Sequence, residues 1–98
     1  MGLRLVTPGT AAHRPPSLTG ELDIRKAYNA HVSELYRFAL RATGDENSSQ
    51  DIVQETFLRA WRSADRFDPA LASLRVWLFA IARNVVVDHH RAMGARPW

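Results

Sequence analysis

The sequence predicts an all-α fold, a compact bundle of three main helices that follows a flexible N-terminal leader. Apolar residues recur at spacings of three and four in three separate stretches, which is typical of amphipathic helices. Turn-forming Gly, Pro and Ser lie between these stretches. A run of valines at 85–87 favours a strand locally, but it lies inside a helical period, and we predict a helix there.

The leader is predicted over residues 1–19, which are rich in Gly, Pro, Thr and Ala and show no periodicity. One folded domain is predicted over residues 20–96, because a chain of 98 residues suffices for a single core. The start lacks the long apolar segment of a secretory signal, and no apolar run could cross a membrane. We therefore expect a cytoplasmic protein without membrane insertion.

The first helix is predicted from about Glu21 to Thr43. Its buried stripe is expected to consist of Ile24, Tyr28, His31 or Val32, Leu35, Ala39 and Ala42. Gly44 supplies the left-handed residue that commonly ends a helix.

The second helix is predicted from about Ser48 to Ala64, with Ser48 and Asp51 as its cap pair. The apolar residues 52, 53, 57, 60 and 61 would form an inner side. The outer side carries Asp51, Gln54, Glu55 and Arg62, interrupted only by Leu58. This outer side is either a solvated face or a surface on which a partner helix docks.

Residues 65–73 are predicted to form a connector with at most one short turn, because Pro69 biases Asp68 away from helical geometry. Phe67 either packs the connector onto the helices or anchors a partner. Ser73 is predicted to cap the third helix, from about Leu74 to Ala92. Its core stripe is expected to be Leu74, Trp77 or Leu78, Ile81 and Val85.

No pattern of a catalytic site is present. The chain has no cysteine, which excludes disulfides and thiolate metal sites, and its four histidines lack metal-ligand spacing. It has no nucleophile elbow, no glycine-rich phosphate loop and no carboxylate pair with a nearby base. We therefore predict that the protein is not an enzyme and has no catalytic residue, metal site or cofactor.

Charge is distributed unevenly along the chain. Residues 21–66 carry seven basic and eight acidic side chains, whereas residues 74–98 carry four arginines against Asp88 alone. Twelve of the thirteen basic residues are arginines, which suit planar contacts to phosphates and bases better than lysine does. The third helix is therefore a candidate for nucleic-acid binding, with a solvated basic face as the alternative.

Three segments, YRFALRATGD, QDIVQETFLRAWRSADRFDP and SLRVWLFAIARNVVVDHHR, carry a resemblance to a known family. Their order and spacing resemble region 2 of the bacterial extracytoplasmic-function (ECF) sigma factors, the compact branch of the sigma-70 family, over about Tyr28 to Arg91. Two positions depart from the common pattern. Ala72 stands where many relatives have glycine, and Gln50 where many have an acidic residue.

The resemblance implies a transcription initiation factor whose second helix docks on the β′ clamp helices of bacterial core RNA polymerase. The implied polymerase-binding residues are Asp51, Gln54, Glu55, Leu58 and Arg62. This implication favours a docking surface over a solvated face. The resemblance also implies a further partner, an anti-sigma factor that would cover the same face.

The resemblance also implies recognition and melting of the promoter −10 element, with a non-template base flipped into the loop from Phe67 to Ser73. The implied DNA-binding residues are Phe67, Ser73, Arg75, Arg83, Asn84, Asp88, His90 and Arg91. Among them Asn84 is expected to contact a base, and His90 and Arg91 to contact phosphate. Unstacking a base costs a few kcal/mol, which a preformed pocket can offset.

Two functions of other classes remain as alternatives. One is a three-helix protein-interaction module without nucleic-acid binding, and the other is a helix-turn-helix regulator that binds duplex DNA as a dimer. No stretch fits the −35-binding region 4 domain that complete ECF sigma factors carry, so we expect a truncated region 2 or an isolated module.

Overall fold

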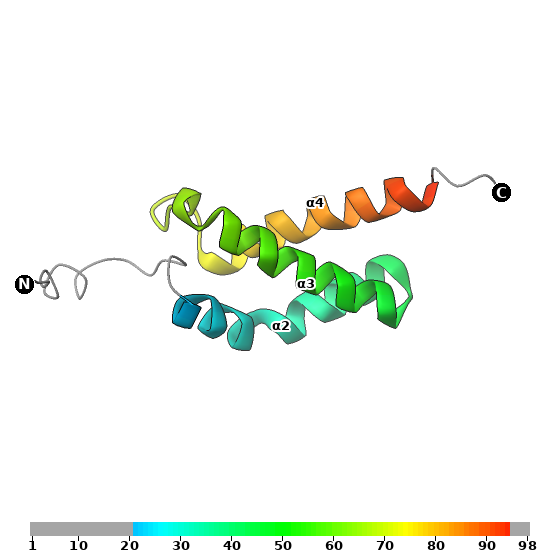
Figure 1. Ribbon diagram of the computed structural model, residues 1–98, viewed down its shortest axis with the longest axis horizontal. Coiled ribbons are helices and arrows are strands. Elements are labelled where there is room, and N and C mark those ends of the chain that lie inside the picture. Colours follow the sequence, from blue (N-terminus) through cyan, green and yellow to red (C-terminus); the bar gives the residue numbers. More distant parts are fainter. Residues whose placement is uncertain (1–20, 95–98) are drawn as a thin grey trace, which may run out of the picture.

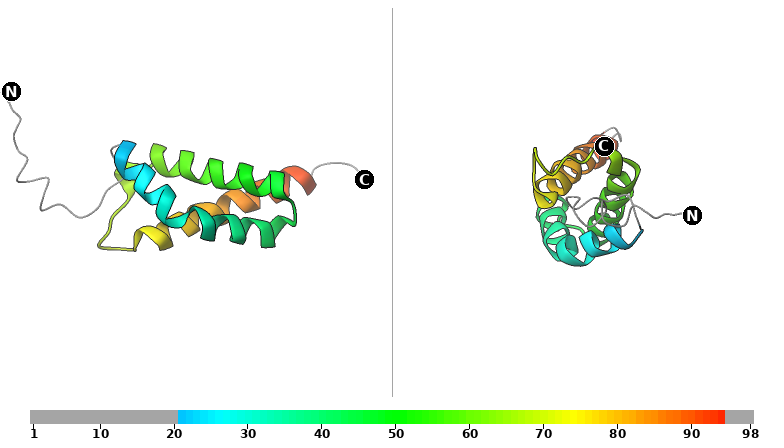
Figure 2. Two further views of the ribbon diagram at one scale, coloured as in Figure 1. Left: turned by 90° about the horizontal axis from the view of Figure 1, so that it is seen from below. Right: turned by 90° about the vertical axis from the view of Figure 1, so that its left-hand side faces the viewer.

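The computed structural model describes residues 21–94, with only the backbone at residues 21 and 22. In that range it contains no strand and three long helices, α2 (Glu21–Thr43), α3 (Glu46–Arg62) and α4 (Leu74–Gly94). The chain reverses twice, so α2 and α4 run in one direction and α3 in the other (Figure 1). Seen end-on in Figure 2, the three helices form a triangle. The predicted all-α bundle is confirmed, whereas the predicted leader lies outside the described residues.

A corner of two residues joins α2 to α3. Gly44 has φ +69° and donates its N–H to the carbonyl of Leu40 at 2.7 Å, as expected of a helix-ending glycine. Asp45 is the N-cap of α3, because its Oδ2 accepts the N–H of Ser48 at 2.7 Å. This bond lowers the pKa of the Asp45 carboxyl, since it favours the charged form.

The predicted start of the second helix is therefore wrong. The cap is Asp45 alone, not the pair Ser48 and Asp51, and α3 begins at Glu46. An aspartate placed directly after the left-handed Gly44 already reaches the first free N–H groups of the helix, so Ser48 lies in its first turn.

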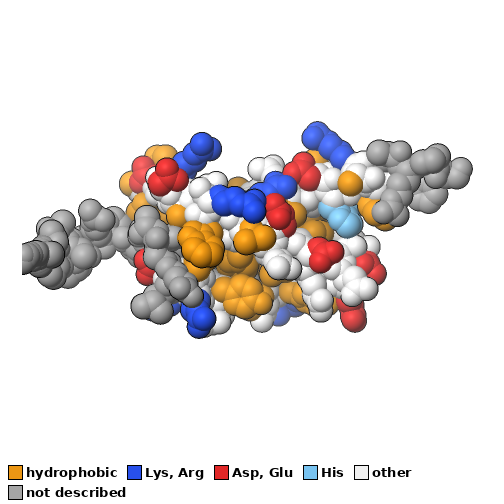
Figure 3. All heavy atoms as spheres, viewed as in Figure 1, with side chains coloured by type: hydrophobic (Ala, Val, Ile, Leu, Met, Phe, Trp, Pro, Cys, Tyr) orange, Lys and Arg blue, Asp and Glu red, His pale blue; other side chains and the backbone are white. Residues whose placement is uncertain are grey.

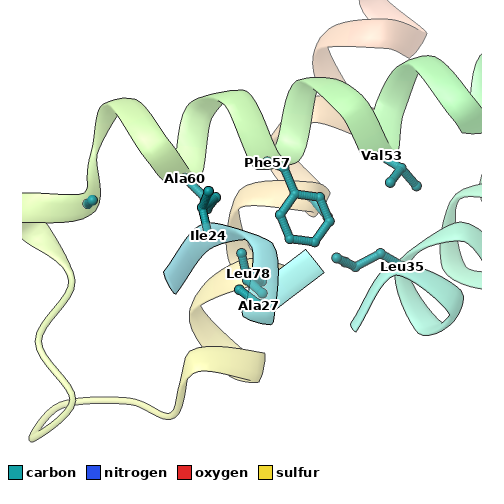
Figure 4. Packing of buried hydrophobic residues seen from close by; sticks show 9 residues of the cluster. Ile24, Ala27, Leu35, Val53, Phe57, Ala60 and Leu78 are labelled. Carbon is teal, nitrogen blue, oxygen red and sulfur yellow. The ribbon is translucent and has the colours of Figure 1, made fainter. Parts of the chain in front are cut away.

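The core lies along the inner side of α3. Val53, Phe57 and Ala60 point from α3 toward residues of the two other helices (Figure 4). Their partners include Ile24, Ala27 and Leu35 of α2 and Leu78 of α4, and Leu35 and Leu78 are 1% and 0% exposed. Trp61 does not belong to this inner side. It is 50% exposed, although its spacing had placed it with the apolar residues of the second helix.

The connector between α3 and α4 packs against α4. A short 3-10 helix, η2 (Ala64–Arg66), is followed by Phe67, whose ring centroid lies 5.0 Å from that of Trp77. Asp68 organises the next turn by accepting the N–H of Ala70 on its Oδ1 at 2.9 Å. Ser73 Oγ then accepts the N–H of Val76 at 3.1 Å, which confirms the predicted cap of the third helix.

No helix in residues 21–94 combines the length and the apolar character that crossing a membrane requires.

Two leucine-to-alanine substitutions should differ in their effect on stability, because one lies in the core and the other in the connector. Leu78→Ala should lower the free energy of unfolding by about 2–5 kcal/mol, because it leaves a cavity where α4 meets the other helices. Leu71→Ala, at a side chain that is 83% exposed, should change it by less than about 0.5 kcal/mol. Urea unfolding followed by circular dichroism measures both. Equal losses for the two variants would contradict this placement of the core.

Candidate functional site

The outer side of α3 presents the residues that the sequence had grouped there. Asp51, Gln54, Leu58 and Arg62 are exposed, and Glu55 is partly buried. Because α3 packs its opposite side against α2 and α4, this face is open along the described length of the helix. It therefore offers a continuous surface of carboxylate, amide, apolar and guanidinium groups.

An ion-pair chain leads from this face to α4. Arg59 Nε lies 3.0 Å from Glu55 Oε2, and Arg59 Nη2 lies 3.0 Å from Asp88 Oδ2. Arg62 Nη1 lies 4.0 Å from the same oxygen of Glu55. The bonds with Glu55 and then with Asp88 raise the pKa of Arg59. Glu55 and Asp88 are thus partly engaged in joining α3 to α4.

Sequence reasoning did not select Arg59. The four-residue spacing from Glu55 could have indicated the pair within α3, because residues four apart face each other on a helix. The bond to Asp88 could not be found in this way, since it depends on how α4 packs against α3.

A groove of about 640 Å³ runs beside the outer side of α3, between α2 and α3. Tyr28 and Trp61 are 44% and 50% exposed, and the Tyr28 ring lies 5.0 Å from that of Phe57 (centroid to centroid). Figure 3 shows hydrophobic side chains gathered on this side of the molecule among charged groups. The lining residues are Ile24, Arg25, Tyr28, Val32, Tyr36, Gln50, Val53, Gln54, Phe57, Leu58 and Trp61.

The groove is continuous with the predicted docking face, because Gln54 and Leu58 belong to both. It therefore adds Tyr28 and Trp61 to the candidate surface. Tyr28 and Trp61 had been assigned to apolar stripes, yet about half of each side chain is in contact with solvent. For Trp61 a signal existed in the sequence, since it lies three residues after Leu58 and thus close to the outer side.

The candidate residues on α4 fall into two groups. Arg83, Asn84 and Arg91 are exposed, and none of them forms an ion pair or side-chain hydrogen bond with another described residue. Val76 and Val87 are 55% and 44% exposed on the same helix. This outer side of α4 combines charged, amide and apolar groups that are free to meet a ligand.

The other candidates already hold the fold together. Arg75 Nε lies 3.0 Å from Glu34 Oε2, and its guanidinium carbon lies 4.7 Å above the ring centroid of Phe79. The hydrogen bond from Arg75, followed by that from His31, lowers the pKa of Glu34. His90 Nε2 lies 3.1 Å from the carbonyl oxygen of Ala42.

These contacts fasten α4 to α2 along its length. Ser73 and Phe67, two further candidates, serve as helix cap and as packing partner of Trp77. A ligand that engages any of these side chains has to share it with an intramolecular partner.

Comparison with known families identifies the domain. The family described as Sigma-70 region 2 matches residues 27–96. This chain belongs to that family. The predicted kinship with the ECF branch is confirmed as well, because curated relatives carry that designation.

Three of these relatives give the extent of the similarity. The chain is 42% identical over 73 residues to ECF RNA polymerase sigma factor SigL of Mycobacterium tuberculosis, which covers 74% of the chain and 41% of the relative. It is 47% identical over 68 residues to SigC of the same organism, covering 69% and 36%. It is 34% identical over 70 residues to SigM of Bacillus subtilis, covering 71% and 42%. The chain thus spans less than half the length of these relatives.

In this sigma-70 region 2 domain, the candidate residues lie on two sides of one small bundle. The groove and the outer side of α3 form the first, and the connector with the outer side of α4 forms the second. Arg59 bridges them through Glu55 and Asp88.

The role of Arg59 in joining α3 to α4 can be tested by comparing its substitution with that of Arg62. Arg59→Ala should lower the free energy of unfolding by about 1 kcal/mol, because it removes two ion pairs and a partly buried side-chain stem. Arg62→Ala removes the same charge from a side chain that is 68% exposed and should change stability by less than about 0.5 kcal/mol. Urea unfolding of both variants provides the comparison. If the two losses are indistinguishable, Arg59 does not join the helices.

Proposed function

We propose that this domain is the part of an ECF sigma factor that docks on bacterial core RNA polymerase. Its docking residues would be Asp51, Gln54, Glu55, Leu58 and Arg62, and the partner would be the β′ clamp helices. Membership in the sigma-70 region 2 family and relatives named as ECF RNA polymerase sigma factors support this proposal. An anti-sigma factor that covers the same face would compete with polymerase.

The observation that carries the proposal is the open outer side of α3. Leu58 is 37% exposed between polar groups and also lines the groove, so it offers an apolar contact at the centre of the face. A partner helix could bury Leu58 while Gln54 and Arg62 fix its register. Exposed apolar residues framed by polar groups are typical of docking surfaces.

We further propose that the connector and α4 recognise and melt the promoter −10 element. A flipped non-template base would be held by the loop after Phe67 and read by Asn84 of α4. The turn around Asp68 is organised by the hydrogen bond to Ala70, which supports a preformed loop. The amide of Asn84 can both donate to and accept from a base edge, and no described residue occupies it.

Phosphate contacts would come from Arg83 and Arg91, whose guanidinium groups are free of described partners. Arg75 and His90 would reach DNA only by sharing or leaving Glu34 and Ala42. We therefore rank these two behind Arg83 and Arg91 as phosphate ligands.

A double substitution on the outer side of α3 tests polymerase docking. Gln54→Ala with Leu58→Ala should weaken binding to purified core RNA polymerase at least about tenfold, because it removes the central contacts of the face. Both side chains are exposed, so the thermal midpoint should stay nearly unchanged. Fluorescence anisotropy of the labelled domain gives the affinity.

The matched control is Lys26→Ala with Ser33→Ala, two exposed residues of α2. The control variant should bind polymerase like the wild type. Absence of binding by the folded wild type would favour a protein-interaction module with another partner.

Asn84 and Arg91 should affect DNA binding differently. Asn84→Ala should reduce discrimination among bases at the flipped position by roughly 1–3 kcal/mol, whereas Arg91→Ala should weaken all sequences alike. The measurement uses single-stranded −10 oligonucleotides with each base in turn, bound to the domain assembled with core polymerase. An Asn84→Ala variant with unchanged base preference would remove Asn84 from the reading of the base.

A further inference from the structure

Three exposed arginines without described partners lie on α2 and α4, two helices that pack against each other. Arg37 and Arg41 of α2 and Arg83 of α4 are exposed. Among residues 21–94 none of these three side chains has an ion-pair or hydrogen-bond partner. Only Arg83 belongs to the candidate DNA surface described above.

The contacts between α2 and α4 bring these arginines to one level of the bundle. The rings of Phe38 and Phe79 meet with centroids 5.5 Å apart. Arg41 follows Phe38 by three residues and Arg83 follows Phe79 by four, so both project about one turn beyond the ring pair. The helices α2 and α4 run in the same direction (Figure 1). Arg41 and Arg83 therefore both lie on the C-terminal side of the ring pair. Arg37 lies one turn before Arg41 on the outer side of α2.

Two carboxylates in this part of the bundle are already engaged. Glu34, on the same side of α2, is held by Arg75 at 3.0 Å and faces His31 at 3.4 Å. Asp45, in the corner after α2, caps α3 by accepting the N–H of Ser48. Three guanidinium groups without a counter-charge repel one another, and a bound anion would relieve that repulsion.

We infer that Arg37 and Arg41, together with Arg83, bind successive phosphates of a single-stranded nucleic acid. The inference rests on the proposed recognition of the −10 strand by α4 and extends that site onto α2. Guanidinium groups bind phosphate with paired N–H donors, and a row of them suits a ligand with repeated phosphates. A strand with a base at Asn84 can pass over Arg83 and continue across α2.

The test measures binding of a fluorescein-labelled single-stranded DNA of about 15 nucleotides to the whole chain at several salt concentrations. Arg37→Ala and Arg41→Ala should each weaken binding roughly fivefold to tenfold at about 50 mM salt, and each should reduce the slope of log K against log salt by about 0.7. The double variant Arg37→Lys with Arg41→Lys retains the charge and should keep most of that slope. Circular dichroism should show all variants folded, because neither arginine has a partner among the described residues.

The matched control is Lys26→Ala, which removes one charge from an exposed residue of the same helix, roughly 22 Å from Arg41 along the axis. It should bind like the wild type. An equal loss for Lys26→Ala and Arg41→Ala would show a general effect of net charge and overturn the inference. Wild-type affinity in both arginine variants would overturn it too, while dependence on Arg83 and Asn84 would still support the proposed −10 recognition. If the wild-type chain binds no single-stranded DNA, the inference fails, whereas the proposed −10 recognition is decided by the binding measured on the domain assembled with core polymerase.

Discussion

The corner between α2 and α3 sets the arrangement on which the rest of the bundle depends. Gly44 at φ +69° ends one helix, and Asp45 begins the next without a spacer. Two residues leave little freedom, so α3 must return along α2 in one register. That register places Val53, Phe57 and Ala60 against α2 and leaves a core surface on which Leu78 of α4 packs. It also directs Gln54 and Leu58 toward the groove and the solvent.

Small side chains let the helices approach closely. Ala27, Ala60 and Ala82, one from each helix, are all at most 2% exposed. Large residues are then few in the centre, with Leu35 and Leu78 as its fully buried leucines. Aromatic residues pack around this centre, where their rings meet in the pairs of Phe38 with Phe79 and of Phe67 with Trp77. Such a core leaves substantial aromatic surface near solvent, which is why Tyr28 and Trp61 can line an open groove.

Local sequence signals predicted the fold class and the bounds of α2, because the fold class depends on apolar spacing and the end of α2 depends on Gly44. The start of α3 was missed because the competition between Asp45 and Ser48 for the cap depends on the backbone at Gly44. The outer side of α3 was found from spacing, and four of its five residues are exposed as expected, whereas Glu55 is partly buried. The partners of Arg75, Asp88 and His90 could not be found, since each contact joins two helices far apart in the sequence. Pairing across helices follows from tertiary packing, which local patterns do not contain.

The position of Arg59 has a consequence for how this domain can vary in evolution. One guanidinium is shared by Glu55 on the α3 side and Asp88 on the α4 side. Loss of either carboxylate leaves Arg59 to the other, so the effect of a second change depends on the first. Substitutions at Glu55 and Asp88 should therefore be non-additive, so a residue accepted on one side of the bundle alters which residues are tolerated on the other.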